Sequence, residues 1–257
     1  VIRTTGDRVT DAPLSQIGDR GVFTKEIDSA VLEQSADIAV HSLKDLPTRI
    51  TEGLALVAIT EREDPRDVLI TRTGTSSLRR RAQLLARRSD LRVADLRGNL
   101  NTRLAKLDAG DYDAIVLAAA GVIRLELADR ISQWLDPEWW LPAVGQGALA
   151  APCRADDDAM YALLRETVHH APTGYAAEAE RGFLRQVGGG CRVPLGAWAR
   201  LDDEDRLVVD ACIAALDGSR LFRRRRTCAP RDGRGAGAAL ADQLLGDIAL
   251  GALGEGA

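Results

Sequence analysis

Hydrophobic and polar positions follow two different periods in the first quarter of the chain. Apolar residues recur at helical spacing over 23–32, where Ile27 and Val31 fall on one side. Short apolar runs at 37–41 and 54–59 come next, and we interpret both as buried strands because they are too short for helices. A helix followed by strands joined through a polar loop predicts the beginning of an α/β unit.

The middle of the chain repeats strand and helix in turn. We predict strands at 68–70, 91–96 and 112–117, and helices at 78–88, 99–107 and 118–127. Strands that alternate with helices are typical of mainly parallel sheets with helices on both faces. We therefore expect the fold class to be α/β.

The last third of the chain has a different order of elements. A glycine-marked turn leads into a predicted strand at 145–151, and a helix is expected around 159–168. Pro172-Thr173-Gly174 marks a boundary. The elements expected after it are a helix at 175–187, strands at 193–200, 207–216 and 221–227, and a helix near 238–250. This order predicts a small C-terminal α+β unit.

Composition excludes several classes of protein. With 46% hydrophobic and 28% charged residues among 257, the chain has the make-up of an ordinary globular protein of one to three domains. No apolar run approaches the roughly 18 residues that cross a bilayer, so we expect no membrane association. The net charge of −4 gives no overall basic surface for nucleic acid.

The few cysteines and histidines also limit the chemistry. Four cysteines without a C-x-x-C pair, together with three histidines, argue against a zinc site or a disulfide framework. We expect no metal and a reducing, cytoplasmic location. All but three of the 34 basic residues are arginine, the lysines being Lys25, Lys44 and Lys106.

The most informative stretch is Asp37–Pro47, where a short apolar strand runs directly into polar residues. Ser42, Lys44 and Asp45 follow the strand, and Pro47 prevents its regular continuation. The carboxyl ends of strands are where α/β sheets usually build sites. A lysine beside an aspartate keeps the carboxylate ionised. Lys44 and Asp45 are therefore site candidates, although a surface ion pair is the alternative.

Two strand–helix junctions are rich in arginine and small polar residues. In the first, Gly74-Thr75-Ser76-Ser77 precedes Arg79 and Arg80, and in the second Arg97-Gly98-Asn99 precedes Arg103. Hydroxyl groups and backbone N–H groups at a helix start bind anions, and the planar guanidinium matches a carboxylate. The arrangement predicts a ligand with several carboxylates or phosphates. A solvated basic face is the alternative, and no P-loop sequence supports a nucleoside triphosphate.

Two glycine-flanked residues complete the set of candidates. Cys191 follows Gly188-Gly189-Gly190 and precedes Arg192, which favours an accessible, reactive or covalently modified thiol. Without a nearby histidine, cysteine-protease chemistry has no support. Gln146, between Gly145 and Gly147, is a weaker candidate for a hydrogen bond to a ligand, and a simple turn is the alternative.

Taken in order, these motifs resemble the hydroxymethylbilane synthase (porphobilinogen deaminase) family. The resemblance covers nearly the whole chain and rests on residues 21–26, 37–47, 63–67, 74–80, 96–103, 141–149 and 189–194. It implies that the protein joins four porphobilinogen molecules head to tail into hydroxymethylbilane, in porphyrin and haem biosynthesis, and releases ammonia at each addition. The chain grows on a dipyrromethane cofactor held by a thioether to a cysteine.

The resemblance also implies a role for each candidate residue. Asp45 matches the catalytic aspartate, which assists loss of the amine and stabilises the resulting cation, and Cys191 matches the cofactor-bearing cysteine. Lys25 matches a lysine on a flexible loop over the cleft. The carboxylates of cofactor and substrate are bound by Arg79, Arg80, Arg97 and Arg103, with help from Ser42, Lys44, Thr75, Ser77 and Gln146.

The family's architecture implies three domains. Two resemble periplasmic binding proteins, with mainly parallel sheets, and the third is a small α+β unit. We expect domain 1 at 1–64 and 143–168, domain 2 at 65–142 and domain 3 at 169–257, in a monomer. Two departures concern the family's first strand with its Gly-Thr-Arg-x-Ser segment, which has no match, and the short connection 71–73. We expect the natural protein to have further residues at both places.

Two other classes of function remain as alternatives. A non-catalytic two-lobed protein that binds a polycarboxylate would use the same arginines but would need neither Asp45 nor an open Cys191. A nucleic-acid binder is suggested by eight arginines between Arg79 and Arg103. The negative net charge and the lack of aromatic stacking platforms argue against it.

Overall fold

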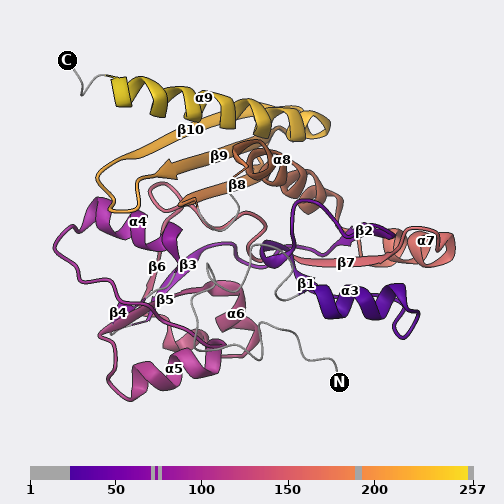
Figure 1. Ribbon diagram of the computed structural model, residues 1–257, viewed down its shortest axis with the longest axis horizontal. Helices are drawn as coiled ribbons and strands as arrows, with labels where there is room; N and C mark the ends of the chain where they lie inside the picture. The colour runs from indigo at the N-terminus through magenta and orange to yellow at the C-terminus, as the bar shows by residue number, and fades with distance from the viewer. Residues whose placement is uncertain (1–23, 71–72, 75–76, 189–192, 254–257) are drawn as a thin grey trace.

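The computed structural model describes residues 24–70, 73–74, 77–188 and 193–253 of the 257-residue chain. Within these residues the strands form three separate sheets (Figure 1). Sheet A has the order β1 (His41–Ser42), β7 (Leu149–Arg154), β2 (Leu54–Ile59). Sheet B has the order β4 (Thr73–Gly74), β5 (Ala114–Ala118), β3 (Asp67–Ile70), β6 (Gln133–Trp134). Sheet C has the order β10 (Leu221–Cys228), β9 (Leu207–Ala214), β8 (Leu195–Leu201).

Sheet A is built from segments that are far apart in the sequence. Strand β7 lies in the middle and pairs antiparallel with both β1 and β2. Helix α3 (Lys25–Leu32) packs Val31 against Ala39 and Leu54, and helix α7 (Asp158–Thr167) packs Leu164 against β2 and β7. A 3₁₀ turn, η1 (Leu43–Asp45), follows β1 directly. Sheet A thereby fixes where the Lys44–Asp45 segment leaves the core.

Sheet B lies between two hydrophobic clusters, because alternate residues along its strands face opposite sides of the sheet. Val68 and Ile70 of β3 face a cluster formed with helices α5 (Leu100–Asp108) and α6 (Ala119–Arg124). Leu69 faces the other side, where it packs with Trp140 and with Leu84 of helix α4 (Leu78–Arg87). Helix α4 therefore covers one face of the sheet, and α5 and α6 cover the other.

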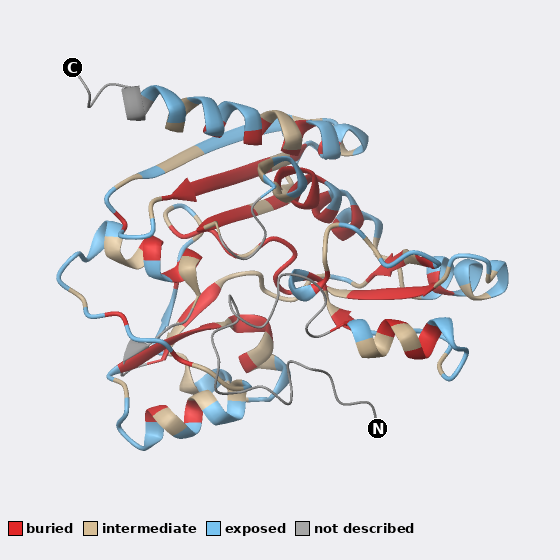
Figure 2. Cartoon of the chain, viewed as in Figure 1, coloured by how far each residue is buried: buried red, intermediate tan, exposed pale blue. Residues whose placement is uncertain are grey.

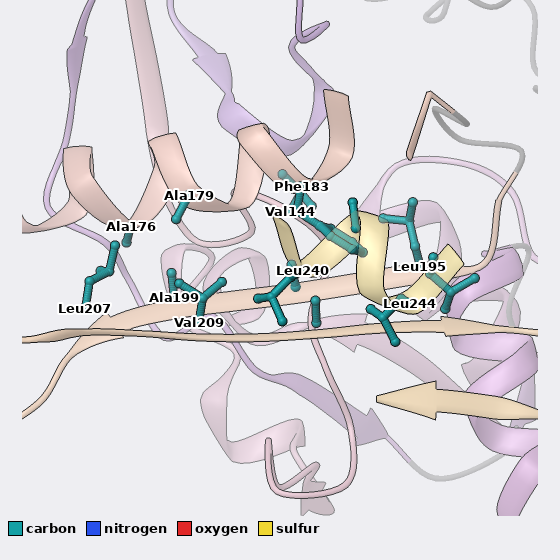
Figure 3. Close-up of a cluster of buried hydrophobic side chains, with 14 residues drawn as sticks. Val144, Ala176, Ala179, Phe183, Leu195, Ala199, Leu207, Val209, Leu240 and Leu244 are labelled. Carbon is teal, nitrogen blue, oxygen red and sulfur yellow. The ribbon is translucent and has the colours of Figure 1, made fainter. Parts of the chain in front are cut away.

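Sheet C carries helices α8 (Ala171–Val187) and α9 (Gly233–Leu253) on one face. Val209 of β9 alternates with residues that face away, and it joins Phe183 and Leu240 in the largest hydrophobic cluster (Figure 3). Most of β8 and β9 is buried, whereas β10 is largely exposed (Figure 2). The two helices approach closely at Gly237, where a Cβ would lie 2.0 Å from the Ala179 carbonyl oxygen. The short turns η2 (Ala128–Arg130) and η4 (Pro230–Asp232) complete the described elements.

The α/β class and the small C-terminal unit are confirmed, but the expectation of mainly parallel sheets is not. Among the described ladders only β4 with β5 is parallel, and the others are antiparallel. Residues 91–96 form no strand, and Val93 and Leu96 are buried individually. The predicted strand at 37–41 is reduced to β1 and a bridge at Ile38. Ile38 and Val40 are exposed, because this segment lies at the edge of sheet A.

Candidate functional site

A cavity of about 220 Å³ lies between elements of sheet A and elements of sheet B. Sheet A and the turn before β7 contribute Ser42, Lys44, Gly147 and Ala148 to its lining. The sheet B side contributes Arg80, Gly98, Asn99, Leu100, Arg103, Leu117, Ala118, Ala120, Gly121 and Arg124. Four of the lining side chains are cationic and none is acidic. A cavity of this kind is suited to a ligand with several negative charges.

Lys44 and Asp45 are held in place by the main chain on either side of them. The N–H of Leu43 donates to the carbonyl oxygen of Ala148 at 3.0 Å, and the N–H of Leu46 donates back to Leu43 at 3.2 Å. The side chains of Leu43 and Leu46 are buried, whereas Lys44 and Asp45 are exposed. The sequence therefore alternates anchors and polar residues, and the two charged side chains are presented at the edge of the cavity.

The Lys44 ammonium has an altered acidity. Desolvation by the surrounding cavity walls lowers the pKa of Lys44 to about 8, with Arg80 and Arg79 acting in the same direction and Asp45 and Asp67 opposing them. The side chain is exposed along part of its length and lines the cavity. Its Nζ lies 3.5 Å from Oε1 of Gln146. Lys44 therefore titrates close to physiological pH.

A fully buried carboxylate, Asp67, organises the arginine side of the site. Oδ2 accepts from Arg79 Nη1 at 2.8 Å and from Trp140 Nε1 at 2.7 Å. Oδ1 accepts from Arg80 Nη2 at 2.7 Å and from Gln146 Nε2 at 2.8 Å. The two guanidinium groups keep the pKa of Asp67 far below its usual range despite its burial. Together, Asp67, Arg79 and Arg80 carry one net positive charge. Of the three, Arg80 lines the cavity.

Arg103, in helix α5, also lines the cavity. Its Nε donates to the Gly98 carbonyl oxygen at 2.7 Å. Gly98 has φ +113°, and a Cβ there would lie 2.7 Å from Thr102, so only glycine fits this turn. Burial lowers the pKa of Arg103 to about 10, helped by Arg80 and Arg97 and opposed by Asp45. The positive charges on this wall thus outweigh the negative ones.

Arg124 lines the cavity as well, although it was not among the residues expected there from the sequence. It is the last residue of α6, and its Nη2 donates to the Gly147 carbonyl oxygen at 2.7 Å across the cavity. Gly121 lies three residues earlier on the same helix and also lines the cavity. That i, i+3 spacing of a glycine and an arginine directly after a buried strand was the available sequence signal.

The remaining candidates lie at different distances from the cavity. Ser42 lines it, and Ser77 caps α4, where its Oγ accepts from the Arg80 N–H at 3.4 Å. Arg79 and Gln146 are buried behind the wall, and Arg97 is half-buried outside the lining. Lys25, expected on a loop, is the exposed first residue of α3. The predicted residues Thr75 and Cys191 lie outside the described part of the chain.

The described residues offer neither a cluster of metal ligands nor a membrane-spanning helix. Within the described ranges, no group of three or more histidine, cysteine, aspartate or glutamate side chains is placed to hold a metal ion. Among the same residues, no helix is both long and apolar enough to cross a membrane.

Comparisons with known proteins agree with the motifs. A family model described as the porphobilinogen deaminase dipyrromethane cofactor binding domain matches residues 1–162, and one described as the porphobilinogen deaminase C-terminal domain matches residues 175–246. A protein named porphobilinogen deaminase from Syntrophobacter fumaroxidans is 45% identical over 258 residues, which is 95% of this chain and 83% of the relative. Proteins with the same name from Desulforudis audaxviator and Gloeobacter violaceus are both 49% identical over 95% of this chain, and the matches cover 82% and 79% of their lengths.

Proposed function

This chain belongs to the porphobilinogen deaminase family, and we propose that the cavity between sheets A and B is its active site. The enzyme is a transferase that condenses four porphobilinogen molecules head to tail into hydroxymethylbilane. At each addition the aminomethyl C–N bond breaks, ammonia leaves, a C–C bond forms to the next pyrrole, and that pyrrole carbon loses its proton. The chemistry needs binding of carboxylates and a base near a transient cation.

The charge balance of the cavity supports the binding of carboxylates. Each porphobilinogen carries an acetate and a propionate, and the dipyrromethane cofactor of the family carries the same groups. Arg80, Arg103, Arg124 and Lys44 line one small cavity, and the pKa of Arg103 is already lowered by burial and neighbouring cations. A carboxylate at this wall would compensate those charges. The residues present therefore fit a polycarboxylate cofactor and substrate.

Asp45 is the residue we assign to the chemical step. Its charge acts on both Lys44 and Arg103, so it lies at the edge of the cationic wall. A carboxylate there stabilises positive charge that develops as the amine leaves, and it accepts the proton released when the new bond forms. When bound, the cofactor supplies the pyrrole to which the first substrate is joined, and we assign its thioether attachment to Cys191.

The remaining assignments complete the proposal. Lys25 acts at the entrance to the cavity. Six further residues help to bind and orient the carboxylates of cofactor and substrate: Ser42, Thr75, Ser77, Gln146, Arg79 and Arg97. The domains are 1–64 with 143–168, 65–142, and 169–257. We propose a cytoplasmic monomer that acts on porphobilinogen and uses neither nucleic acid nor membrane.

Asp45→Ala tests the proposal most directly. We expect the variant to fold and to keep the dipyrromethane mass on Cys191, measured on the intact protein and by peptide mapping, while turnover falls by at least about a hundredfold. The matched control is Asp37→Ala, since Asp37 is an exposed aspartate of the same segment, 3.9 Å from Arg154. Normal turnover in Asp45→Ala would contradict the assignment, and an unmodified Cys191 in active protein would contradict the cofactor site.

A further inference from the structure

Helix α8 lies beneath the Lys44–Asp45 turn and contacts it through both apolar and polar groups. Ala177 of α8 is buried in the same cluster as Leu43 and Leu46, the two residues that flank the turn. One helical turn later, Arg181 lies on the same face of α8 and is only 4% exposed. The turn is therefore packed against a helix from the C-terminal third of the chain.

Arg181 binds the main chain directly after Asp45. Its Nη1 donates to the Leu46 carbonyl oxygen at 3.1 Å, and its Nη2 donates to the Pro47 carbonyl oxygen at 2.6 Å. Consecutive carbonyl groups are thus held by the two terminal nitrogens of one rigid guanidinium fork. The other side of the turn is held by the bond from Leu43 N–H to Ala148. Asp45 lies between these two anchors, and Arg181 is the one that a side-chain substitution can remove.

Keeping a guanidinium in this position is energetically costly. Burial lowers the pKa of Arg181 to about 10, and nearby Arg185 lowers it further, while Glu178 opposes them. Neutral carbonyl groups compensate a buried charge less well than a carboxylate does. An apolar side chain packed on Leu46 would avoid that cost but could not fix two carbonyl groups. The arrangement gives precision of the turn at the expense of solvation.

The neighbouring residue extends the same platform. Glu180 is fully buried, and its Oε2 accepts from the Gly145 N–H at 2.7 Å, while its Oε1 pairs with Arg62 at 2.6 Å. Consecutive residues of α8 therefore hold the turn after Asp45 and the turn before Gln146. The helix ends at Val187, and its C-cap Gly188 lies three residues before Cys191 in the sequence.

We propose that Arg181 is a positioning residue that fixes the Asp45 turn relative to α8, and that it acts on the chemical step rather than on substrate binding. This inference rests on the proposed role of Asp45. Arg181 is not part of the cavity lining, so its removal should not change the carboxylate-binding wall. A displacement of the Asp45 carboxylate by about 1 Å is enough to slow the chemical step, because that step depends on the geometry of the reacting groups.

The test compares three variants of the cofactor-bearing enzyme. Arg181→Met removes the fork and keeps an unbranched side chain, and Arg181→Lys keeps the charge but can hold only one carbonyl well. Arg185→Met is the matched control, because Arg185 is an exposed arginine of the same helix with a single 3.3 Å bond to the Thr48 carbonyl oxygen. Turnover is expressed per molecule that carries the cofactor mass.

We expect Arg181→Met to lower kcat by about tenfold to a hundredfold with KM within about twofold of the parent. Arg181→Lys should recover part of kcat, and Arg185→Met should match the parent. Hydrogen exchange at the amides of Leu43 and Leu46 should rise in Arg181→Met but not in the control.

Two results would overturn the inference. One is an unchanged kcat per cofactor-bearing molecule in both Arg181 variants, which would leave a purely structural role. The other is unchanged exchange at Leu46 despite a lower kcat. If Arg181→Met does not fold, the same comparison is made on Arg181→Lys. Asp45→Ala separates the two proposals: activity without Asp45 would refute the proposed function, whereas an enzyme that needs Asp45 but not Arg181 would refute only this inference.

Discussion

Replacing the buried carboxylate of Asp67 by an amide should destabilise the protein strongly. Asp67 is fully buried between Arg79 and Arg80, whose side chains are each only 7% exposed. In Asp67→Asn the two guanidiniums lose their shared negative charge. The new amide nitrogen replaces one of the two oxygens, so it faces N–H donors either from Arg79 and Trp140 or from Arg80 and Gln146. Removing one partner of a buried ion pair costs about 3–5 kcal/mol. We expect a loss of this size in the free energy of unfolding.

The assay is urea unfolding, with a control taken from the same segment. Asp64 pairs with Arg66 at 2.6 Å, but the two side chains are 21% and 36% exposed. Solvent-exposed pairs contribute about 0–1 kcal/mol, so Asp64→Asn should stay close to the parent. A loss of less than about 1 kcal/mol in Asp67→Asn, or equal losses in the two variants, would refute the reasoning.

The pH dependence of the same difference gives a second measurement. The pKa of Asp67 is depressed in the folded state, so its contribution to stability is fully present above the unfolded-state pKa of about 3.9. It is lost as the pH falls toward the folded-state pKa. The difference between the parent and Asp67→Asn should therefore be constant from about pH 5 to 8 and shrink below about pH 4. A difference that instead grows in acid would contradict the charge argument.

Two further predictions concern the cavity and its turn. Because the pKa of Lys44 is about 8, its ammonium loses its charge above that pH. KM for porphobilinogen should therefore rise above pH 8, and Lys44→Arg should flatten the rise. A pH-independent KM in the parent would contradict this prediction. Gly147 has φ +96° and would place a Cβ 2.4 Å from the Glu63 carbonyl oxygen, so Gly147→Ala should lose more than about 1 kcal/mol in urea unfolding, whereas Gly235→Ala, where nothing lies within 4 Å, should not.

The elements of the C-terminal unit could be predicted from the sequence because their determinants are local. Val209, Ala211 and Ile213 alternate with polar or outward residues, and all three face the helices of sheet C. The predicted strands and helices there match β8, β9, β10, α8 and α9 to within a few residues at most boundaries. Hydrophobic period alone fixes which face of such a strand is buried.

Strand direction could not be predicted in the same way. In sheet A, Leu54 of β2 pairs with Arg154 of β7, about a hundred residues later, and the pairing is antiparallel. The alternation of strand and helix indicates how consecutive segments pair. It does not predict the pairing of β2 with β7, because all the strands of sheet B lie between them in the sequence. The short apolar run at 91–96 shows the same limit, since burial of Val93 and Leu96 required no ladder.

The arginines at the start of α4 show which part of the site could be predicted from local sequence. Arg79 and Arg80 in the first turn of α4 are unfavourable for the helix dipole, and this predicted an anion beside them. The structure places the protein's own Asp67 carboxylate there. In the sequence Asp67 appears in a charged, proline-interrupted segment, which hid its burial. The available signal for its burial was its position two residues before Leu69, because residues i and i+2 of a strand share a face. Asp67 and Leu69 both lie on the face of β3 toward α4.

This pairing changes how the anion-binding capacity of the site is counted. One carboxylate shared by two guanidiniums leaves one net positive charge, and only Arg80 of the pair reaches the cavity lining. The rest of the capacity comes from Arg103, Arg124 and Lys44, which are contributed by three different segments. Looking for arginines at helix starts finds Arg79, Arg80 and Arg103, but it misses Arg124, which is the last residue of α6. The cationic wall is therefore a property of how sheets A and B meet, and its strength depends on the buried Asp67 that keeps Arg80 in place.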